Sequence, residues 1–225
     1  TGAKGIIGTN DASIINDGVI NVNGTGAQGI YIERGATLTN TGQINVNGDG
    51  KIGVFIGMGS SFVNTAGITI SSGGTTVFDG GGTLANIGDI VIDGPSATVN
   101  GITINNTGKI EITGSLDFTG NIILETVAGK AGTINVGGLS GTGHIILSPD
   151  AALGNNYDMH HVQLLGGLSN PETETIRVTS QSVSFIAEKY FDKDLNSYVL
   201  TLTRIPYAQM LKNTEAVEFG KGLDQ

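Results

Sequence analysis

The chain has 225 residues, of which 37 are glycine and 14% are charged, and it contains no cysteine and no tryptophan. Glycine is more than twice as frequent as in an average protein (about 7%), but with four prolines and no Gly-X-Y period the sequence is not collagen-like. The net charge of −9 with eleven Lys and Arg residues argues against a nucleic-acid groove, and the lack of cysteine excludes a disulfide scaffold and a thiolate metal site.

Five asparagines mark an internal repeat that decides the expected fold. They follow one another at intervals of 24, 24, 22 and 20 residues: Asn16, Asn40, Asn64, Asn86 and Asn106. In each copy an apolar residue lies two positions before the asparagine, a small residue two positions after it, and apolar residues four and six positions after it. Alternating apolar residues are typical of a strand with one buried face, while asparagine and glycine favour a tight bend. A third apolar run precedes the early asparagines, so each repeat contains about three short strands.

A unit this short cannot bury its own apolar face, but stacked copies can. The sequence therefore predicts an all-β fold, a right-handed parallel β-helix with three strands per coil and about seven coils. Like residues stack on like, so isoleucine columns fill the interior and the five asparagines form a structural ladder of hydrogen-bonded side chains. Glycosylation is the alternative for such a regular series, but none of the five asparagines begins an Asn-x-Ser/Thr pattern.

The coils are expected to occupy residues 1–156, with the repeat degenerate after Gly114. Residues 157–206 are more charged and contain four strand-like runs: Val162–Leu165, Thr175–Val178, Val183–Ala187 and Ser197–Leu202. We expect an antiparallel cap there, with a hairpin loop at Tyr190–Asn196, because the exposed end of a β-helix is a row of unpaired backbone groups. The tail, residues 207–225, is expected to contain a short helix that begins near Pro206.

The end of the chain resembles a known family. A Gly/Asn/Ile-rich β-helix, the Tyr-x-Leu-x-Leu-x-Arg stretch at Tyr198–Arg204 and a short helix after it are similar to the C-terminal part of an autotransporter passenger (type V secretion). The resemblance implies that residues 157–206 are an autochaperone-like cap that seeds folding outside the cell. It also implies that residues 207–225 link the passenger to its own outer-membrane β-barrel, and that the protein is at the surface or outer membrane of a Gram-negative bacterium, or is secreted from it.

Residues that could carry chemistry are scattered. The acidic residues at or near expected turns are Asp79, Asp89, Asp93 and Asp117. They form no cluster of the paired carboxylates that glycoside hydrolysis requires. His160 and His161 are adjacent, so they point to opposite faces of a strand and make a poor zinc site. The glycine-rich run 53–59 lacks the lysine of a phosphate loop. The sequence therefore predicts no catalytic, cofactor-binding or metal-binding residue, and a protein that is not an enzyme.

One outward strip is a candidate interaction surface. Tyr31 and Phe55 are 24 residues apart, Ile7 precedes Tyr31 by the same interval, and Val77 is the expected successor. If their neighbours point inward, these side chains form an apolar ladder on the outside, and exposed apolar strips often bind partners. The alternative is that they face inward themselves or are covered by loops.

The predicted function is a non-enzymatic surface protein, an adhesin stalk or adhesion module. Its partner would be a host or microbial surface protein or glycan, and no nucleic acid is expected to bind. Two alternatives stay open at the level of the sequence: a self-associating structural module, and a polysaccharide-degrading enzyme on the same fold. Because residues 1–4 lead directly into a repeat, we also interpret the chain as a piece of a longer protein.

Overall fold

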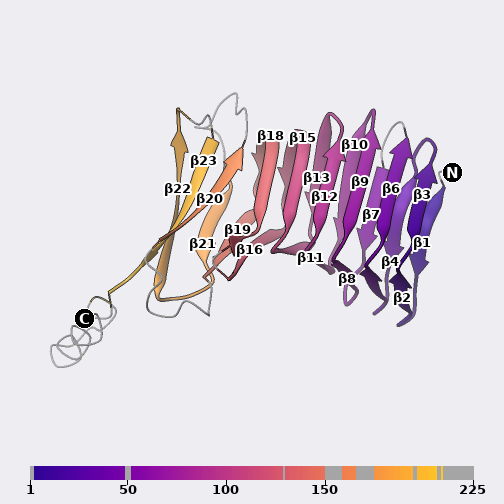
Figure 1. Ribbon diagram of the computed structural model, residues 1–225, viewed down its shortest axis with the longest axis horizontal. Helices are drawn as coiled ribbons and strands as arrows, with labels where there is room; N and C mark the ends of the chain where they lie inside the picture. Colours follow the sequence, from indigo (N-terminus) through magenta and orange to yellow (C-terminus); the bar gives the residue numbers. More distant parts are fainter. Residues whose placement is uncertain are drawn as a thin grey trace.

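The protein is an all-β parallel β-solenoid with a small antiparallel unit at its C-terminal end (Figure 1). The computed structural model describes residues 3–48, 52–128, 130–149, 159–165, 175–194, 197–206 and 209, with side chains left out at 52, 159–165 and 197. The coils stack along the long axis of Figure 1, with the N-terminal strands at the right and the antiparallel unit at the left. This confirms the predicted fold class, while the right-handed sense of the coils stays a prediction.

Each regular coil contributes one strand to each of three faces, as the repeat predicts. The first face begins with β1 (Lys4–Gly8), β4 (Gln28–Ile32), β7 (Ile52–Ile56), β10 (Thr75–Gly80) and β13 (Ser96–Asn100). The second consists of β2 (Ser13–Asn16), β5 (Thr37–Asn40), β8 (Ser61–Asn64), β11 (Thr83–Asn86), β14 (Thr103–Asn106), β16 (Asn121–Val127), β19 (His144–Ser148) and β21 (Arg177–Ser180). The third begins with β3 (Val19–Asn23), β6 (Gln43–Gly48), β9 (Gly67–Ser72) and β12 (Asp89–Asp93).

Two longer strands run around the corner between the third and first faces. In β15 (Lys109–Phe118) and β18 (Thr133–Gly141) the first half pairs on the third face and the second half pairs on the first face. A short hairpin of β16 with β17 (Lys130–Ala131) interrupts the sixth coil. About six regular coils result, and β18, β19 and β20 (Met159–Leu165) outline a further one whose last strand also belongs to the antiparallel unit.

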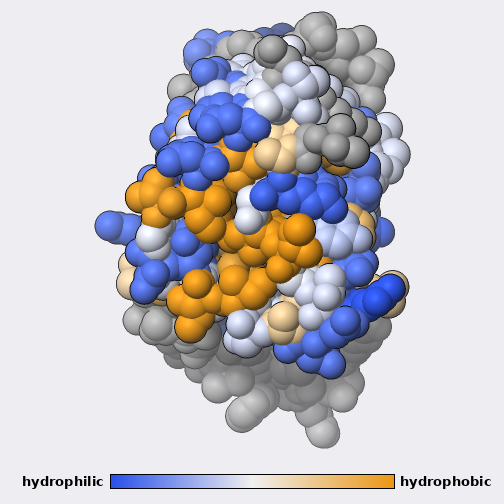
Figure 2. All heavy atoms as spheres, turned by 90° about the vertical axis from the view of Figure 1, so that its right-hand side faces the viewer, coloured by the Kyte–Doolittle hydropathy of each residue, from blue (hydrophilic) through white to orange (hydrophobic). Residues whose placement is uncertain are grey.

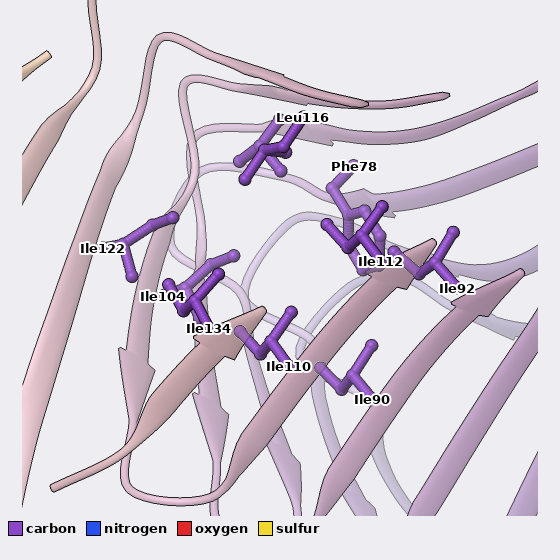
Figure 3. A pocket seen from close by; sticks show the side chains of 10 residues that line it. Phe78, Ile90, Ile92, Ile104, Ile110, Ile112, Leu116, Ile122 and Ile134 are labelled. Atoms are coloured by element: carbon purple, nitrogen blue, oxygen red, sulfur yellow. The ribbon is translucent and has the colours of Figure 1, made fainter. Parts of the chain in front are cut away.

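The interior is filled by the predicted apolar columns. The isoleucines four positions after the asparagines pair in register from β3 to β15: Ile20, Ile44, Ile68, Ile90 and Ile110. All are buried except Ile20, which is half-buried in the first coil. Figure 3 shows side chains from the fourth to sixth coils pointing inward around a cavity of about 20 Å³. A void of this size is about large enough for one water-sized sphere, and its lining is entirely apolar, so the columns fill the interior with little empty space.

The asparagine ladder is present as predicted. Each side-chain amide donates to the Oδ1 of the next asparagine along the axis, at 2.7 Å from Asn16 to Asn40 and at 2.8–2.9 Å for the three later steps. The last one, Asn106, donates instead to the carbonyls of Gly108 and Thr133. Because all five side chains are buried, these bonds satisfy polar groups at the corner between the second and third faces that water cannot reach.

The glycine two positions after the asparagine has a steric reason in three of the coils, at Gly42, Gly88 and Gly108. A Cβ on Gly42 would collide with the backbone carbonyl of Gly18 one coil earlier, and Gly88 is in the same position against Ala66. The corner backbones therefore approach one another closely, and a larger residue would push the coils apart.

The C-terminal unit is antiparallel but smaller than expected. β23 (Ser197–Arg204) pairs antiparallel with β20 on one side and with β22 (Phe185–Asp192) on the other. The prediction that the run at 177–180 belongs to the antiparallel cap is wrong, because β21 pairs parallel with β19 and extends the second face of the solenoid. The predicted loop at 190–196 is also too long, since Tyr190, Phe191 and Asp192 belong to β22. The predicted helix at 207–225 lies outside the described residues, apart from Gln209.

The unit shares its core with the coils. Leu200 and Leu202 are fully buried and belong to the same apolar cluster as the isoleucine columns. Phe191 packs edge-on against Tyr198, with ring centroids 5.6 Å apart. The Lys189 ammonium donates to the carbonyl of Ile176, which precedes β21. These contacts seal the C-terminal end of the solenoid.

Candidate functional site

The outward side of the first face carries a short aromatic strip, defined here as Ile7, Tyr31 and Phe55. The three residues pair in register across β1, β4 and β7, while their neighbours Ile30, Ile32, Val54 and Ile56 are buried in the core. The Tyr31 and Phe55 rings stack with centroids 4.9 Å apart and planes 17° from parallel. Both aromatic residues are half-buried, whereas Ile7 is 56% exposed. Of the two arrangements that the sequence left open, the structure has the outward one.

Charged groups surround Tyr31. Its hydroxyl donates to Glu33 Oε2 at 2.9 Å, and this hydrogen bond to a carboxylate raises the pKa of Tyr31 above its ordinary value. The Lys4 ammonium lies 4.7 Å from the centre of the Tyr31 ring, within range of a cation–π contact. One face of the tyrosine is therefore against Phe55 and the other is near a cation.

The third predicted member of the strip, Val77, is in a different row. The strand partner of Phe55 in the next coil is Asp79, while Val77 pairs with Gly53 and is 8% exposed. The reason lies in the corner after the first face. Four residues separate β7 from β8, but only two separate β10 from β11. The fourth coil is shortened at that corner, so the 22-residue interval of the asparagines does not apply on the first face, where Phe55 and Asp79 are 24 apart.

A hollow lies beside the strip where the fourth coil replaces an aromatic residue with Asp79. We call it the Gly53 hollow; it has a volume of about 260 Å³ and is lined by Gly26, Ala27, Gln28, Gly53, Val54, Phe55, Val77 and Asp79. Gly53 supplies no side chain to the floor, Phe55 forms one wall, and Gln28 and Val77 stand in the coils before and after. Sequence reasoning missed Gln28, Gly53 and Asp79, because their rows depend on where a coil is lengthened or shortened.

A second hollow lies on the second face, where the β16–β17 hairpin projects. It has a volume of about 520 Å³ and is lined by Ala85, Ile87, Asn105, Thr107, Glu125, Val127 and Lys130. Its walls mix apolar side chains with one acidic and one basic residue. No aromatic residue lines it, and the sequence carried no signal for it.

The acidic residues considered for hydrolysis lie apart from one another. Asp79 and Asp117 are both on the first face, but their strand partners in β13 are Asn100 and Thr98, two different rows. Asp89 and Asp93 are on the third face, where Asp89 pairs with Lys109. Within the described part of the chain, no three His, Cys, Asp or Glu side chains gather closely enough to hold a metal ion.

The histidines are also separated. His144 contacts β21, with its Nε2 2.7 Å from Thr179 Oγ1 and its Nδ1 3.3 Å from the Arg177 guanidinium. Partial burial, and then the positive charge of Arg177, lower the pKa of His144. The side chains of His160 and His161 lie outside the described residues, so the zinc interpretation is not addressed by the structure.

Comparison with known proteins found a similarity for the first part of the chain. Residues 1–67 match a family model described as the BigA third pectate lyase-like domain. Searches of curated proteins and of solved structures gave no significant match. The chain is thus a parallel β-solenoid whose first 67 residues are similar to a pectate lyase-like domain, and this matched part contains the whole aromatic strip. Among the described residues, no helix is long and apolar enough to cross a membrane.

Proposed function

We propose that this chain is a non-enzymatic segment of an autotransporter passenger that acts as an adhesion module at the bacterial surface. The aromatic strip is the observation that carries the proposal. Its two stacked rings and Ile7 project from strands whose other side is locked into the core, so the strip is presented with little freedom to lose on binding. The partner is a surface protein or glycan of a host or another microbe.

The C-terminal unit supports the autotransporter part of the proposal. β23 and β20 offer an antiparallel platform, and β18 joins it in parallel through Ile134 and Asn135. Within this unit, β22 and β23 are joined by only four residues, so this antiparallel hairpin has a smaller loop-closure cost than a parallel coil and can form first. In a passenger exported C-terminal end first, coils would then add to it one at a time. The remaining expected partner is the protein's own outer-membrane β-barrel in the full-length chain.

Adhesion is tested with beads that carry the purified chain. We expect the beads to adhere to at least one of a panel of epithelial and bacterial cells, and the double substitution Tyr31→Ser/Phe55→Ser to reduce the adhering fraction several-fold. The matched control is Ile15→Ser/Val63→Ser, two outward apolar residues of the second face. Equal adhesion by the strip variant, the control and the natural chain would contradict the proposal.

The enzymatic alternative has a separate test. The chain is incubated with a panel of neutral and acidic polysaccharides, and new reducing ends are measured. We expect none above the level of heat-denatured chain. Turnover that is lost with Asp79→Asn or Asp117→Asn would replace the proposal with a polysaccharide-degrading enzyme.

Self-association is the alternative function that the sequence left open, and the end formed by β1, β2 and β3 is where it would be sought. In the described residues, β1, β2 and β3 each pair on one side only, so this end presents three unpaired strand edges. Figure 2 looks onto this end and shows apolar side chains gathered across its middle, with hydrophilic ones around them. Such strand edges can pair with a preceding coil of a longer protein or with strands of another copy. Sedimentation of the chain over a range of concentrations tests this, and a monomer at every concentration would contradict it.

A further inference from the structure

Gly53 lies inside β7, opposite the register shift between Gln28 and Ile30 of β4, and has room for a side chain. Its φ is not in the left-handed region, and a Cβ built on it would meet nothing closer than the Gln28 Cγ at 3.4 Å. By contrast, a Cβ built on Gly29 in the preceding coil would collide with the Val46 side chain, and one built on Gly42 would collide with the Gly18 backbone. Glycine weakens a strand, and inside one it often marks a bulge or a place where a ligand approaches. The missing side chain is what opens the Gly53 hollow.

The hollow has one flat apolar wall. Tyr31 covers the face of the Phe55 ring that looks toward the N-terminal coils, so the opposite face looks toward the fourth coil, where the strand partner is Asp79 rather than a third ring. Phe55, Val77 and Asp79 all line the hollow. Asp79 stands where a third aromatic ring would continue the stack of Tyr31 and Phe55. A planar group that entered the hollow could take the place of that ring.

The polar groups of the hollow are suited to a ligand that donates hydrogen bonds. Asp79 brings a carboxylate, whose Oδ1 also accepts the N–H of Gly80, and this bond holds the side chain at the end of β10. The Gln28 carboxamide reaches over the floor, with its Nε2 3.8 Å from the Cβ position of Gly53. Among the residues that the structure describes, no basic side chain lines the hollow, and the chain as a whole has a net charge of −9. The wall thus offers a ring face and a negative charge to one small ligand.

We propose that the Gly53 hollow binds the guanidinium group of an arginine side chain on a partner protein. The guanidinium is planar, carries several N–H donors and no acceptor, stacks on aromatic faces and pairs with carboxylates in a fork. Phe55 would stack on it, Asp79 would accept its N–H groups, and the Gln28 carbonyl oxygen would accept one more. A volume of about 260 Å³ suits one side chain rather than a chain of sugars. This inference rests on the proposed function, because it names the chemistry of the partner that the same strip binds.

Two other ligands fit less well. A lysine ammonium could pair with Asp79, but it is not planar and keeps its hydration shell, so it would leave the ring face unused. A pyranose ring could lie on Phe55, but it presents acceptors as well as donors, and its neutral hydroxyls draw no benefit from the acidic charge of the chain. Binding of these ligands is therefore an outcome of the test.

The test is a titration of the ¹⁵N-labelled full chain with N-acetyl-arginine amide, followed by amide chemical shifts. We expect saturable shifts centred on Gly53, Val77 and Asp79. N-acetyl-citrulline amide has nearly the same shape without the charge. We expect its affinity to be at least about tenfold lower, because a charge-assisted hydrogen bond is lost. Added salt should also weaken the arginine ligand and leave the citrulline ligand unchanged.

Two variants probe the hollow independently. Gly53→Val fills the floor with a residue that strands favour, so the fold should be kept, and Asp79→Asn removes the charge with almost no change of shape. Each should weaken N-acetyl-arginine amide about tenfold or more. Gly138→Val is the matched control, because Gly138 is also a strand glycine of the first face with its nearest side-chain neighbour, Ser115, at 3.4 Å. It should leave binding unchanged.

Several results would overturn the inference. They are saturable shifts confined to another surface or absent, equal binding of citrulline and arginine ligands, Gly53→Val binding like the natural chain, and tighter binding of N-acetyl-lysine amide or a methyl hexopyranoside in the same hollow. The proposed function fails separately. If beads adhere through Tyr31 and Phe55 while the arginine ligand does not bind, the inference is wrong and adhesion stands. If the ligand binds as expected and the strip variant adheres normally, the hollow binds arginine and the adhesion proposal is wrong.

Discussion

Replacing Asn64 by alanine removes the middle rung of the asparagine ladder. The Asn64 side chain accepts from the Asn40 amide at 2.9 Å, donates to Asn86 Oδ1 at 2.9 Å, and donates to the carbonyl of Ala66 at 3.2 Å. Asn40, Asn64 and Asn86 are all fully buried. The substitution therefore leaves an amide, a side-chain oxygen and a backbone carbonyl without these bonds at a site closed to solvent.

The expected loss of stability follows from the two side-chain groups, because the Ala66 carbonyl still accepts the N–H of Asp89 at 3.0 Å. A buried polar group that loses its partner costs about 1–3 kcal/mol. The space vacated by the amide is polar and can admit a water, which recovers part of the loss, so the lower end of the range applies to each group. We expect the free energy of unfolding to fall by about 2 kcal/mol.

The sequence supplies a control of the same chemistry. Asn45 donates to Asn21 Oδ1 at 2.8 Å in a second ladder on the outside of the third face, where Asn21 is exposed and Asn45 is half-buried, so water can reach the bond. Asn45→Ala should cost less than about 0.5 kcal/mol, because water replaces the lost partner. Urea unfolding followed by far-UV circular dichroism measures both variants. Two results would contradict the idea that burial makes the ladder stabilising. One is an equal loss of unfolding free energy in Asn45→Ala and Asn64→Ala, and the other is an unfolding free energy of Asn64→Ala within about 0.5 kcal/mol of that of the natural chain.

Three further predictions concern the core, the His144 contact and the cap. Ile68→Asn should lower the free energy of unfolding by about 4 kcal/mol, the sum of lost apolar burial and an unpaired amide, and a urea-unfolding loss below about 1 kcal/mol would refute this. The depressed pKa of His144 means that the unfolded chain takes up a proton first, so stability should be constant above about pH 6.5 and fall as the pH drops through the folded pKa; this part of the pH dependence should vanish in His144→Gln when unfolding is compared at about pH 7.5 and about pH 5. Deleting residues 157–206 should leave residues 1–150 slow to refold from denaturant or aggregated, and refolding as fast and as complete as that of the full chain would show that the cap is only a lid.

Much of the solenoid could be predicted because each coil repeats the same local demands. The apolar residues around Asn40 and Asn64 recur at fixed offsets, so the strands, their inward side and the stacking partner one coil away all follow from the period. The ladder follows as well, because an asparagine that recurs at a bend must meet its own copy. Repetition turns a long-range contact into a local rule.

The C-terminal end was predicted less well, because it does not repeat. The runs at 177–180 and 185–192 have similar alternating patterns, yet the first pairs parallel with β19 and the second pairs antiparallel with β23. Alternation shows only that one face of a strand is buried. It carries no information about the direction of the neighbouring strand.

What the sequence by itself determined is the fold class, the columns of the core and the asparagine ladder. What only the tertiary structure decided is which outward side chains share a row. The corner after the first face can lose two residues without disturbing the buried columns, and the fourth coil loses them there, after β10, so Asp79 rather than Val77 follows Phe55. Buried positions are held in register by the core, whereas the outward rows also depend on corner lengths, and that is why the candidate site had to be found in the structure.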